Sequence, residues 1–146
     1  MNINLIGKKP RTNKARVITV TIDRDKALRL AKIGELFTVY QILRLGNPKD
    51  TTGDTIGHIM AGNGYRFTAK EILALGNPKN QNGVTIGHHM VSGNNRCTVA
   101  EILELGNPTD REGKTIGYYI AQKGYKYSVD EILAMGNPKT KFGVSI

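Results

Sequence analysis

The chain has 146 residues, of which 39% are hydrophobic, with no tryptophan and a single cysteine, Cys97. No apolar run reaches the roughly 18 residues that a membrane-spanning helix needs, which argues against a membrane protein. One cysteine excludes an internal disulfide framework, and residues 1–7 lack the long apolar core of a secretory signal. Together these features predict a cytoplasmic protein.

The net charge of +9 is concentrated at the N-terminal end of the chain. Residues 1–32 hold nine Lys and Arg against two Asp, whereas residues 33–146 hold twelve basic and ten acidic residues. Such an asymmetry indicates an acidic partner, either a nucleic acid or the acidic surface of another protein.

Residues 1–24 do not share the pattern of the rest of the chain. The runs 2–6 and 17–22 have the composition of short strands, and the second is rich in β-branched residues. The segment between them contains five basic residues and no acid: Lys8, Lys9, Arg11, Lys14 and Arg16. We therefore predict an N-terminal β-hairpin, or an extended basic arm, over residues 1–24. Its strands would cap the repeats that follow, and capping does not need the basic tip, which makes these five residues candidate binding residues.

From residue 25 onward the sequence is a tandem repeat with a constant period. One segment recurs as QILRLGNP, EILALGNP, EILELGNP and EILAMGNP at 41–48, 71–78, 101–108 and 131–138. A second segment recurs as TIGH, TIGH and TIGY at 55–58, 85–88 and 115–118. This 30-residue repeat predicts one domain over 25–146, with units 25–54, 55–84, 85–114 and 115–144 and a truncated fifth unit at 145–146.

Each unit contains the signals of two short helices. In the second unit, Thr68 and Glu71 form the pattern of a capping box, and the helix that follows stops at Gly76 before Asn-Pro. The other helix starts near Thr55 and stops by residues 62–64. Helices of about two turns are not stable alone, so the units must stack. We therefore predict a mainly α protein, a short solenoid of four stacked helical hairpins.

The Thr-Ile-Gly-His segments at 55–58 and 85–88, with a glycine two residues ahead at Gly53 and Gly83, resemble the Thr-Pro-Leu-His element of ankyrin repeats. The resemblance covers residues 25–146. It implies antiparallel helix pairs joined by projecting loops, and a surface that binds other proteins. The unit here is shorter than the ankyrin unit of about 33 residues, and Ile and Gly replace the Pro and Leu of the element. The shorter unit suggests that the projecting β-hairpin is reduced to a tight turn.

Recognition on repeat scaffolds usually depends on the positions that vary between units. The turns between the two helices of a unit carry the candidate binding residues Tyr65, Arg66, Arg96, Tyr125 and Lys126. Three of them, Arg66, Arg96 and Lys126, occupy one position of the repeat and predict a positive ladder along the stack. A tyrosine beside a cation is a common contact pair at interfaces. The alternative is a solvated charged edge without a binding role.

The histidines allow two interpretations. His58 and His88 fall at the same position of successive units, and His89 and Cys97 could complete a metal site with them. Alternatively, each imidazole bonds to the threonine three residues before it and to loop backbone. The periodicity favours the structural interpretation, and no Cys/His spacing matches a zinc pattern, so we expect no metal and no cofactor.

Two other motifs are explained by the repeat, and no catalytic motif is found. Gly113-Lys114-Thr115 resembles the end of a phosphate-binding loop, but that loop would need glycine where the chain has Pro108. The segment 30–42 resembles a DNA-binding helix-turn-helix, but it matches 61–72 position by position. No arrangement of nucleophile and base lies outside the repeating positions, so we expect no enzyme.

These features favour a non-enzymatic, cytoplasmic adaptor or inhibitor that engages an acidic surface of a partner protein. Its resemblance and size suggest a phage- or bacterium-encoded modulator of a host complex. The alternative is a nucleic-acid-binding protein; since residues 1–32 contain no aromatic side chain, its binding would be independent of base sequence. The apolar residues near the C-terminus, 142–146, also suggest self-association through that end.

Overall fold

The computed structural model describes residues 23–140 and 143–146, and in this part the chain is mainly helical, as predicted. These described residues form eight short α-helices: α1 Arg24–Lys32, α2 Val39–Arg44, α3 Ile56–Gly62, α4 Ala69–Ala74, α5 Ile86–Ser92, α6 Val99–Glu104, α7 Ile116–Gln122 and α8 Val129–Ala134. The predicted N-terminal β-hairpin and its five basic residues fall on residues 1–22, outside the described residues. The helical part begins within the predicted arm, because Asp23 caps α1 and Arg24 is its first residue.

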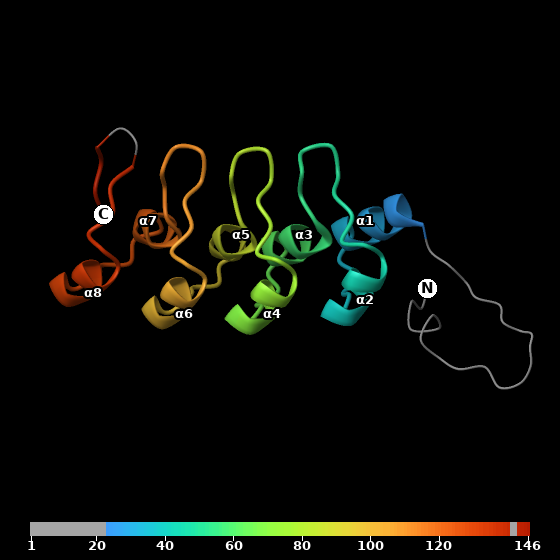
Figure 1. Ribbon diagram of the computed structural model, residues 1–146, viewed down its shortest axis with the longest axis horizontal. Coiled ribbons are helices and arrows are strands. Elements are labelled where there is room, and N and C mark those ends of the chain that lie inside the picture. Colours follow the sequence, from blue (N-terminus) through green and yellow to red (C-terminus); the bar gives the residue numbers. More distant parts are fainter. Residues whose placement is uncertain (1–22, 141–142) are drawn as a thin grey trace, which may run out of the picture.

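The helices are arranged as pairs that lie side by side (Figure 1). The first helices of the pairs, α1, α3, α5 and α7, contact one another in chain order, and among the second helices α4 contacts α6. Loops between successive pairs project from the same side of the row (Figure 1). Each unit therefore packs mainly on the units before and after it.

The second helix of each unit is fixed at both ends by local hydrogen bonds. The predicted capping box at α4 is confirmed, because Glu71 N donates to Thr68 Oγ1 at 3.1 Å and Thr68 N donates to Glu71 Oε1 at 2.9 Å. The other second helices begin with the same capping box, at Thr38, Thr98 and Ser128. Behind α4, Gly76 has φ 86° and Asn77 has φ 46°. Two consecutive left-handed residues end the helix, and the first suits glycine.

The side chains of the first helices form a continuous core along the row. Ile56, Ile86 and Ile116 occupy one position of the repeat and are fully buried. The residue after each of them is a glycine. A Cβ on Gly57 would lie 2.6 Å from Cδ1 of Ile86, so the glycine leaves room for the isoleucine of the next unit. The core is thus built from contacts between neighbouring units.

The loops between units are tight turns that bond to one another. In the first, an antiparallel bridge joins Lys49 and Thr55, and Gly53 N donates to Asp50 O at 3.0 Å. Gln81 N donates to the carbonyl of Thr52 in the preceding loop at 3.0 Å. The next pair of loops repeats this contact, with Arg111 N donating to Asn82 O at 2.8 Å. The projecting side of the row is therefore held by backbone hydrogen bonds at the spacing of the units.

Candidate protein-binding surface

The described candidate residues all lie in the turns that join the first helix of a unit to its second. We call the segments 63–68, 93–98 and 123–128 the turn edge. Tyr65 and Arg66 belong to the first of these segments, Arg96 to the second, and Tyr125 and Lys126 to the third. The five N-terminal basic residues of the predicted arm lie outside the described residues.

Arg66 is engaged in a contact between units. Its guanidinium donates to both carboxylate oxygens of Glu101 on α6, at 2.8 and 3.2 Å, and to the carbonyl of Arg96 at 3.1 Å. This bidentate pair lowers the pKa of Glu101 and raises that of Arg66. The charge of Arg66 is thus largely balanced inside the protein, and its role in the described structure is to join two units.

Arg96 and Lys126 occupy the same repeat position as Arg66 and have a different environment. Arg96 packs over the ring of Tyr125, with its guanidinium carbon 4.2 Å from the ring centroid. That ring stands edge-on to Tyr127, with centroids 4.8 Å apart. Lys126 is exposed. The structure therefore brings Arg96 and Tyr125 together as a cation–aromatic pair in which the arginine is exposed and the ring is partly buried, as an interface could use.

Two grooves open along the turn edge at corresponding places, two units apart. The first, of about 400 Å³, lies between α2 and α4 and includes Tyr65 and Phe67. The second, of about 560 Å³, lies between α6 and α8 and includes Arg96, Tyr125 and Tyr127. The hydroxyl of Tyr127 is buried and has no hydrogen-bond partner within the described residues. Both grooves combine aromatic walls with charged rims.

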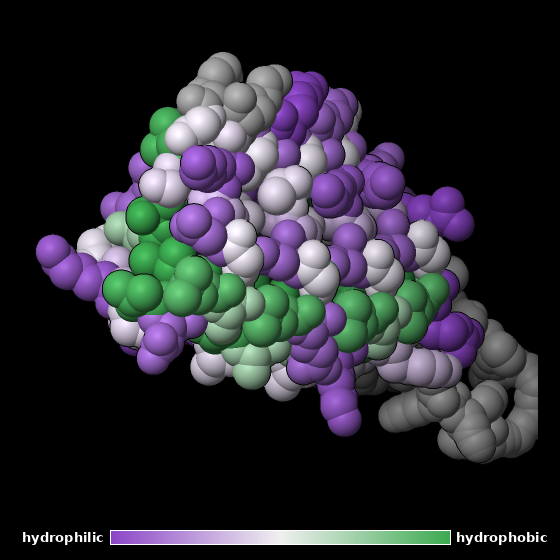
Figure 2. All heavy atoms as spheres, turned by 60° about the vertical axis from the view of Figure 1, so that its left-hand side comes forward, coloured by the Kyte–Doolittle hydropathy of each residue, from purple (hydrophilic) through white to green (hydrophobic). Residues whose placement is uncertain are grey.

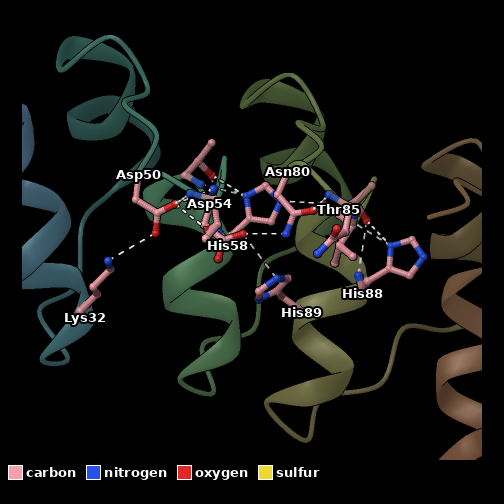
Figure 3. Close-up of polar contacts among 12 residues, drawn as sticks. Lys32, Asp50, Asp54, His58, Asn80, Thr85, His88 and His89 are labelled. Carbon is pink, nitrogen blue, oxygen red and sulfur yellow. Dashed lines mark hydrogen bonds and ion pairs between the residues drawn. The ribbon is translucent and has the colours of Figure 1, made fainter. Parts of the chain in front are cut away.

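His58 and His88 hold the first helix of their unit to the loop that leads into the next unit (Figure 3). Thr55 N donates to Nδ1 of His58 at 3.1 Å, so Nδ1 is the unprotonated nitrogen, and Nε2 donates to the carbonyl of Val84 at 2.8 Å. His88 repeats this arrangement with Thr85 and with the carbonyl of Lys114 at 2.9 Å. The structural interpretation of both histidines is therefore confirmed. Burial lowers their pKa, that of His88 to about 4, so both are neutral near pH 7.

His89, on α5, extends the polar contacts to the loop that precedes α3 (Figure 3). Its Nε2 lies 3.6 Å from Oδ1 of Asp54, which also accepts from Asn80 Nδ2 at 2.8 Å. Its ring packs edge-on against that of His58, with centroids 5.1 Å apart. Burial lowers the pKa of His89 despite the nearby carboxylates. Among residues 23–140 and 143–146, no three His, Cys, Asp or Glu side chains are grouped as metal ligands would be.

A row of exposed leucines on the second helices was not predicted from the sequence. One leucine stands at the same position in every unit, and each is between 44% and 62% exposed: Leu43, Leu73, Leu103 and Leu133. Figure 2 shows a hydrophobic band that runs along the stack of helix pairs. The sequence does show that every QIL or EIL segment has leucine as its third residue, but not on which side of the short helix that leucine lies. We call these four residues the leucine row.

None of the helices in the described part of the chain is long and apolar enough to cross a bilayer. In comparisons with known proteins, no protein-family model and no curated protein matches the sequence.

Proposed function

We propose that the protein is a non-enzymatic, ankyrin-like solenoid that acts in the cytoplasm as an adaptor or inhibitor by binding an acidic surface of another protein. The observation that carries the proposal is that, within each unit, the residues that build the stack differ from the residues that are exposed on the turn edge. The isoleucines and glycines that recur on the first helices make core contacts between units, whereas Arg96 and Lys126, at a turn position whose neighbours vary, are exposed on the turn edge. Recognition at varied surface positions on a repeated framework is the usual arrangement in repeat scaffolds.

The chemistry of the polar groups supports a binding role. His58 and His88 use both ring nitrogens in hydrogen bonds to the framework. Cys97 is buried, and burial raises its pKa to about 11, which leaves little thiolate at neutral pH. Each of these side chains therefore has a structural explanation, and none has the environment of an activated nucleophile or base.

The charge of the surface favours an acidic partner. Arg96, Lys123 and Lys126 are exposed together near the C-terminal end of the turn edge. The strongly basic residues 1–32 add a second positive region at the other end of the sequence. Charges at an interface mainly raise the association rate and select the partner. A nucleic acid is the second candidate, because the same N-terminal charge could neutralise phosphates.

The test is affinity capture from a lysate of the cells that produce the protein, with and without nuclease, followed by identification of what is bound. One variant lacks residues 1–22, and another carries Arg96→Glu and Lys126→Glu. The matched control carries Lys49→Glu and Lys79→Glu, which changes the net charge equally at the loop side of the molecule. All variants are first checked for native helix content by circular dichroism.

We expect one protein partner to remain bound after nuclease treatment. The truncated and the charge-reversed variants should bind this partner at least about tenfold more weakly, whereas the control variant should bind it as the wild type does. Recovery of nucleic acid alone, lost after nuclease treatment or in moderate salt, would favour the second candidate. Equal binding by the charge-reversed variant and its control would remove the turn edge from the proposal.

A further inference from the structure

The leucine row is an apolar surface whose composition does not follow from the needs of the fold. Each of its leucines is about half exposed, although the preceding isoleucine of the first three units (Ile42, Ile72 and Ile102) is fully buried. The neighbouring exposed positions on the second helices include Ala74, Ala100 and Ala134, which add no charge. A continuous apolar band flanked by small residues is typical of a surface that another molecule covers (Figure 2).

The charges along this face change sign at its midpoint. On α2 and α4 the exposed charged positions beside the leucines hold Arg44 and Lys70, and on α6 and α8 the same two positions hold Glu104 and Asp130. Arg44 is oriented by Tyr40, whose hydroxyl accepts from its guanidinium at 2.6 Å. The face therefore has one basic half, one acidic half and an apolar row that runs through both.

A surface of this kind is complementary to itself after a half-turn. The twofold axis of such a contact lies in the contact plane, midway between α4 and α6 and parallel to both helices. Rotation about this axis brings a second copy onto the face with its units in the reverse order. It places α4 opposite α6 of a second copy, and α2 opposite α8. The leucine row then meets the same row. Lys70 comes within one helical turn of Glu104 of the second copy, and Arg44 comes equally close to Asp130 of that copy.

We propose that the second-helix face binds a second copy of this chain, with the unit order reversed and the leucine row at the centre of the contact. Self-complementarity about a twofold axis is what an isologous dimer requires. The opposite arrangement, with the unit order preserved, would set the basic halves against each other and is disfavoured by their charge. The contact does not use Arg96 or Lys126, the residues that the test of the proposed acidic partner changes, so either proposal can fail without the other.

Dimerisation would give the protein two basic N-terminal segments and two turn edges in one particle. Two linked sites bind a repeated or extended acidic partner far more tightly than one site does. The proposal therefore predicts that an acidic partner with repeated sites is held by avidity.

The first test is the mass of the full chain by light scattering at concentrations from about 1 to 100 μM, the range of standard-sized interfaces of modest affinity. We expect twice the chain mass of 16.0 kDa at the upper end. Leu73→Glu should shift the protein to monomer while its circular dichroism stays native, since this side chain is already 44% exposed. Ile33→Glu is the control, because Ile33 is 80% exposed and lies outside the row.

Charge reversal tests the arrangement itself. Lys70→Glu should raise the dissociation constant of the dimer about tenfold, because two like-charged pairs are created per dimer. Adding Glu104→Lys to this variant should return the constant to within about threefold of the wild type. Lys49→Glu, which changes the net charge equally in a loop, should leave it unchanged.

Cross-linking tests the reversed order. With cysteines in place of both Arg44 and Asp130, a short bismaleimide should give covalent dimers and nothing larger, and neither single cysteine variant should cross-link. A ladder of higher species would indicate stacking of units end to end, as the apolar C-terminus suggests, and would overturn the proposal. A monomer at every concentration, an unchanged mass for Leu73→Glu, or failure of the double charge reversal to restore the dimer would overturn it as well.

Discussion

The hydrogen bond from Nε2 of His58 to the carbonyl oxygen of Val84, at 2.8 Å, holds the first helix of one unit to the residue that directly precedes the next unit. One unit later, His88 and Lys114 form the same bond at 2.9 Å. In each case the other ring nitrogen completes a capping box with the threonine at the start of the helix. One side chain therefore stabilises the start of its own helix and the position of the next unit.

We expect His88→Ala to lower the free energy of unfolding by about 2–4 kcal/mol. The substitution removes two buried hydrogen bonds and leaves the Lys114 carbonyl without its donor. His88→Tyr should cost less, because the third unit has Tyr118 at this position and still begins its helix at Thr115. Urea unfolding followed by circular dichroism measures both, and equal costs for the two substitutions would contradict the expectation.

The protein should lose stability as the pH falls from about 6.5 toward 4. Burial lowers the pKa of His58, His88 and His89 in the folded state, so the unfolded chain binds more protons in this range. The stabilisation from neutral imidazoles is complete above pH 6.5 and disappears as the pH passes below the folded-state values. For His88, a change of pKa from 6.5 to about 4 corresponds to about 3 kcal/mol.

Urea unfolding at a series of pH values measures this slope. His88→Tyr lacks one of the three titrating groups, so its stability should fall less steeply between pH 6.5 and 4 than that of the wild type. A wild-type profile that is flat between pH 7 and 5 would contradict the expectation.

Local hydrogen bonds within a unit could be predicted from the sequence because both partners lie within four residues. The capping boxes at Thr68 and its equivalents, the glycine stop at Gly76 and the bond of His58 to Thr55 all belong to this class. The constant length of the repeat also fixes that these local structures recur in one register. These features required no knowledge of how the units are oriented in space.

Contacts between units could not be predicted because they depend on that orientation. Arg66 reaches Glu101 in the next unit, and Asn77 Nδ2 donates to the carbonyl of Leu105 at 3.1 Å. The sequence placed Arg66 in a ladder of equivalent cations, but each cation meets different neighbours because the turn residues vary. The leucine row was overlooked for a related reason: an apolar residue on a short helix indicates the core until the structure shows which side is covered.

Arg66 should contribute to stability mainly through its pair with Glu101. Since the side chains are 39% and 22% exposed, we expect a coupling free energy of about 0.3–1 kcal/mol in a double-mutant cycle of Arg66→Ala and Glu101→Gln. Glutamine at 101 can still accept in the capping box, as Gln41 does in the first unit. The coupling should decline in about 1 M salt.

The equivalent pair, Arg96 and Glu131, provides the control for this cycle. Arg96 packs on the ring of Tyr125 instead of bonding to the carboxylate, so the same two substitutions there should show a smaller coupling. Equal coupling free energies for the two pairs would mean that the bidentate geometry of Arg66 and Glu101 does not contribute to stability.

The close approach of successive units should make alanine unfavourable at a helical glycine. In the interior of a helix, Gly→Ala usually stabilises by about 0.5–1 kcal/mol. At Gly87, however, a Cβ would lie 2.5 Å from Cδ1 of Ile116, which is fully buried. Overpacking of a core costs about 1–3 kcal/mol, so we expect Gly87→Ala to lower the free energy of unfolding despite its better helix propensity.

Two comparisons separate this steric cost from other effects. Gly117→Ala should be closer to neutral, because the nearest atom to its Cβ would be the sulfur of the flexible Met135 side chain at 3.0 Å. Ile116→Val removes Cδ1, and although it costs about 0.5–1.5 kcal/mol alone, it should recover at least half of the loss when combined with Gly87→Ala. If the free-energy costs of Gly87→Ala and Ile116→Val simply added, the clash with Ile116 would not be the reason that alanine is unfavourable. Glycine at position 87 would then need another explanation.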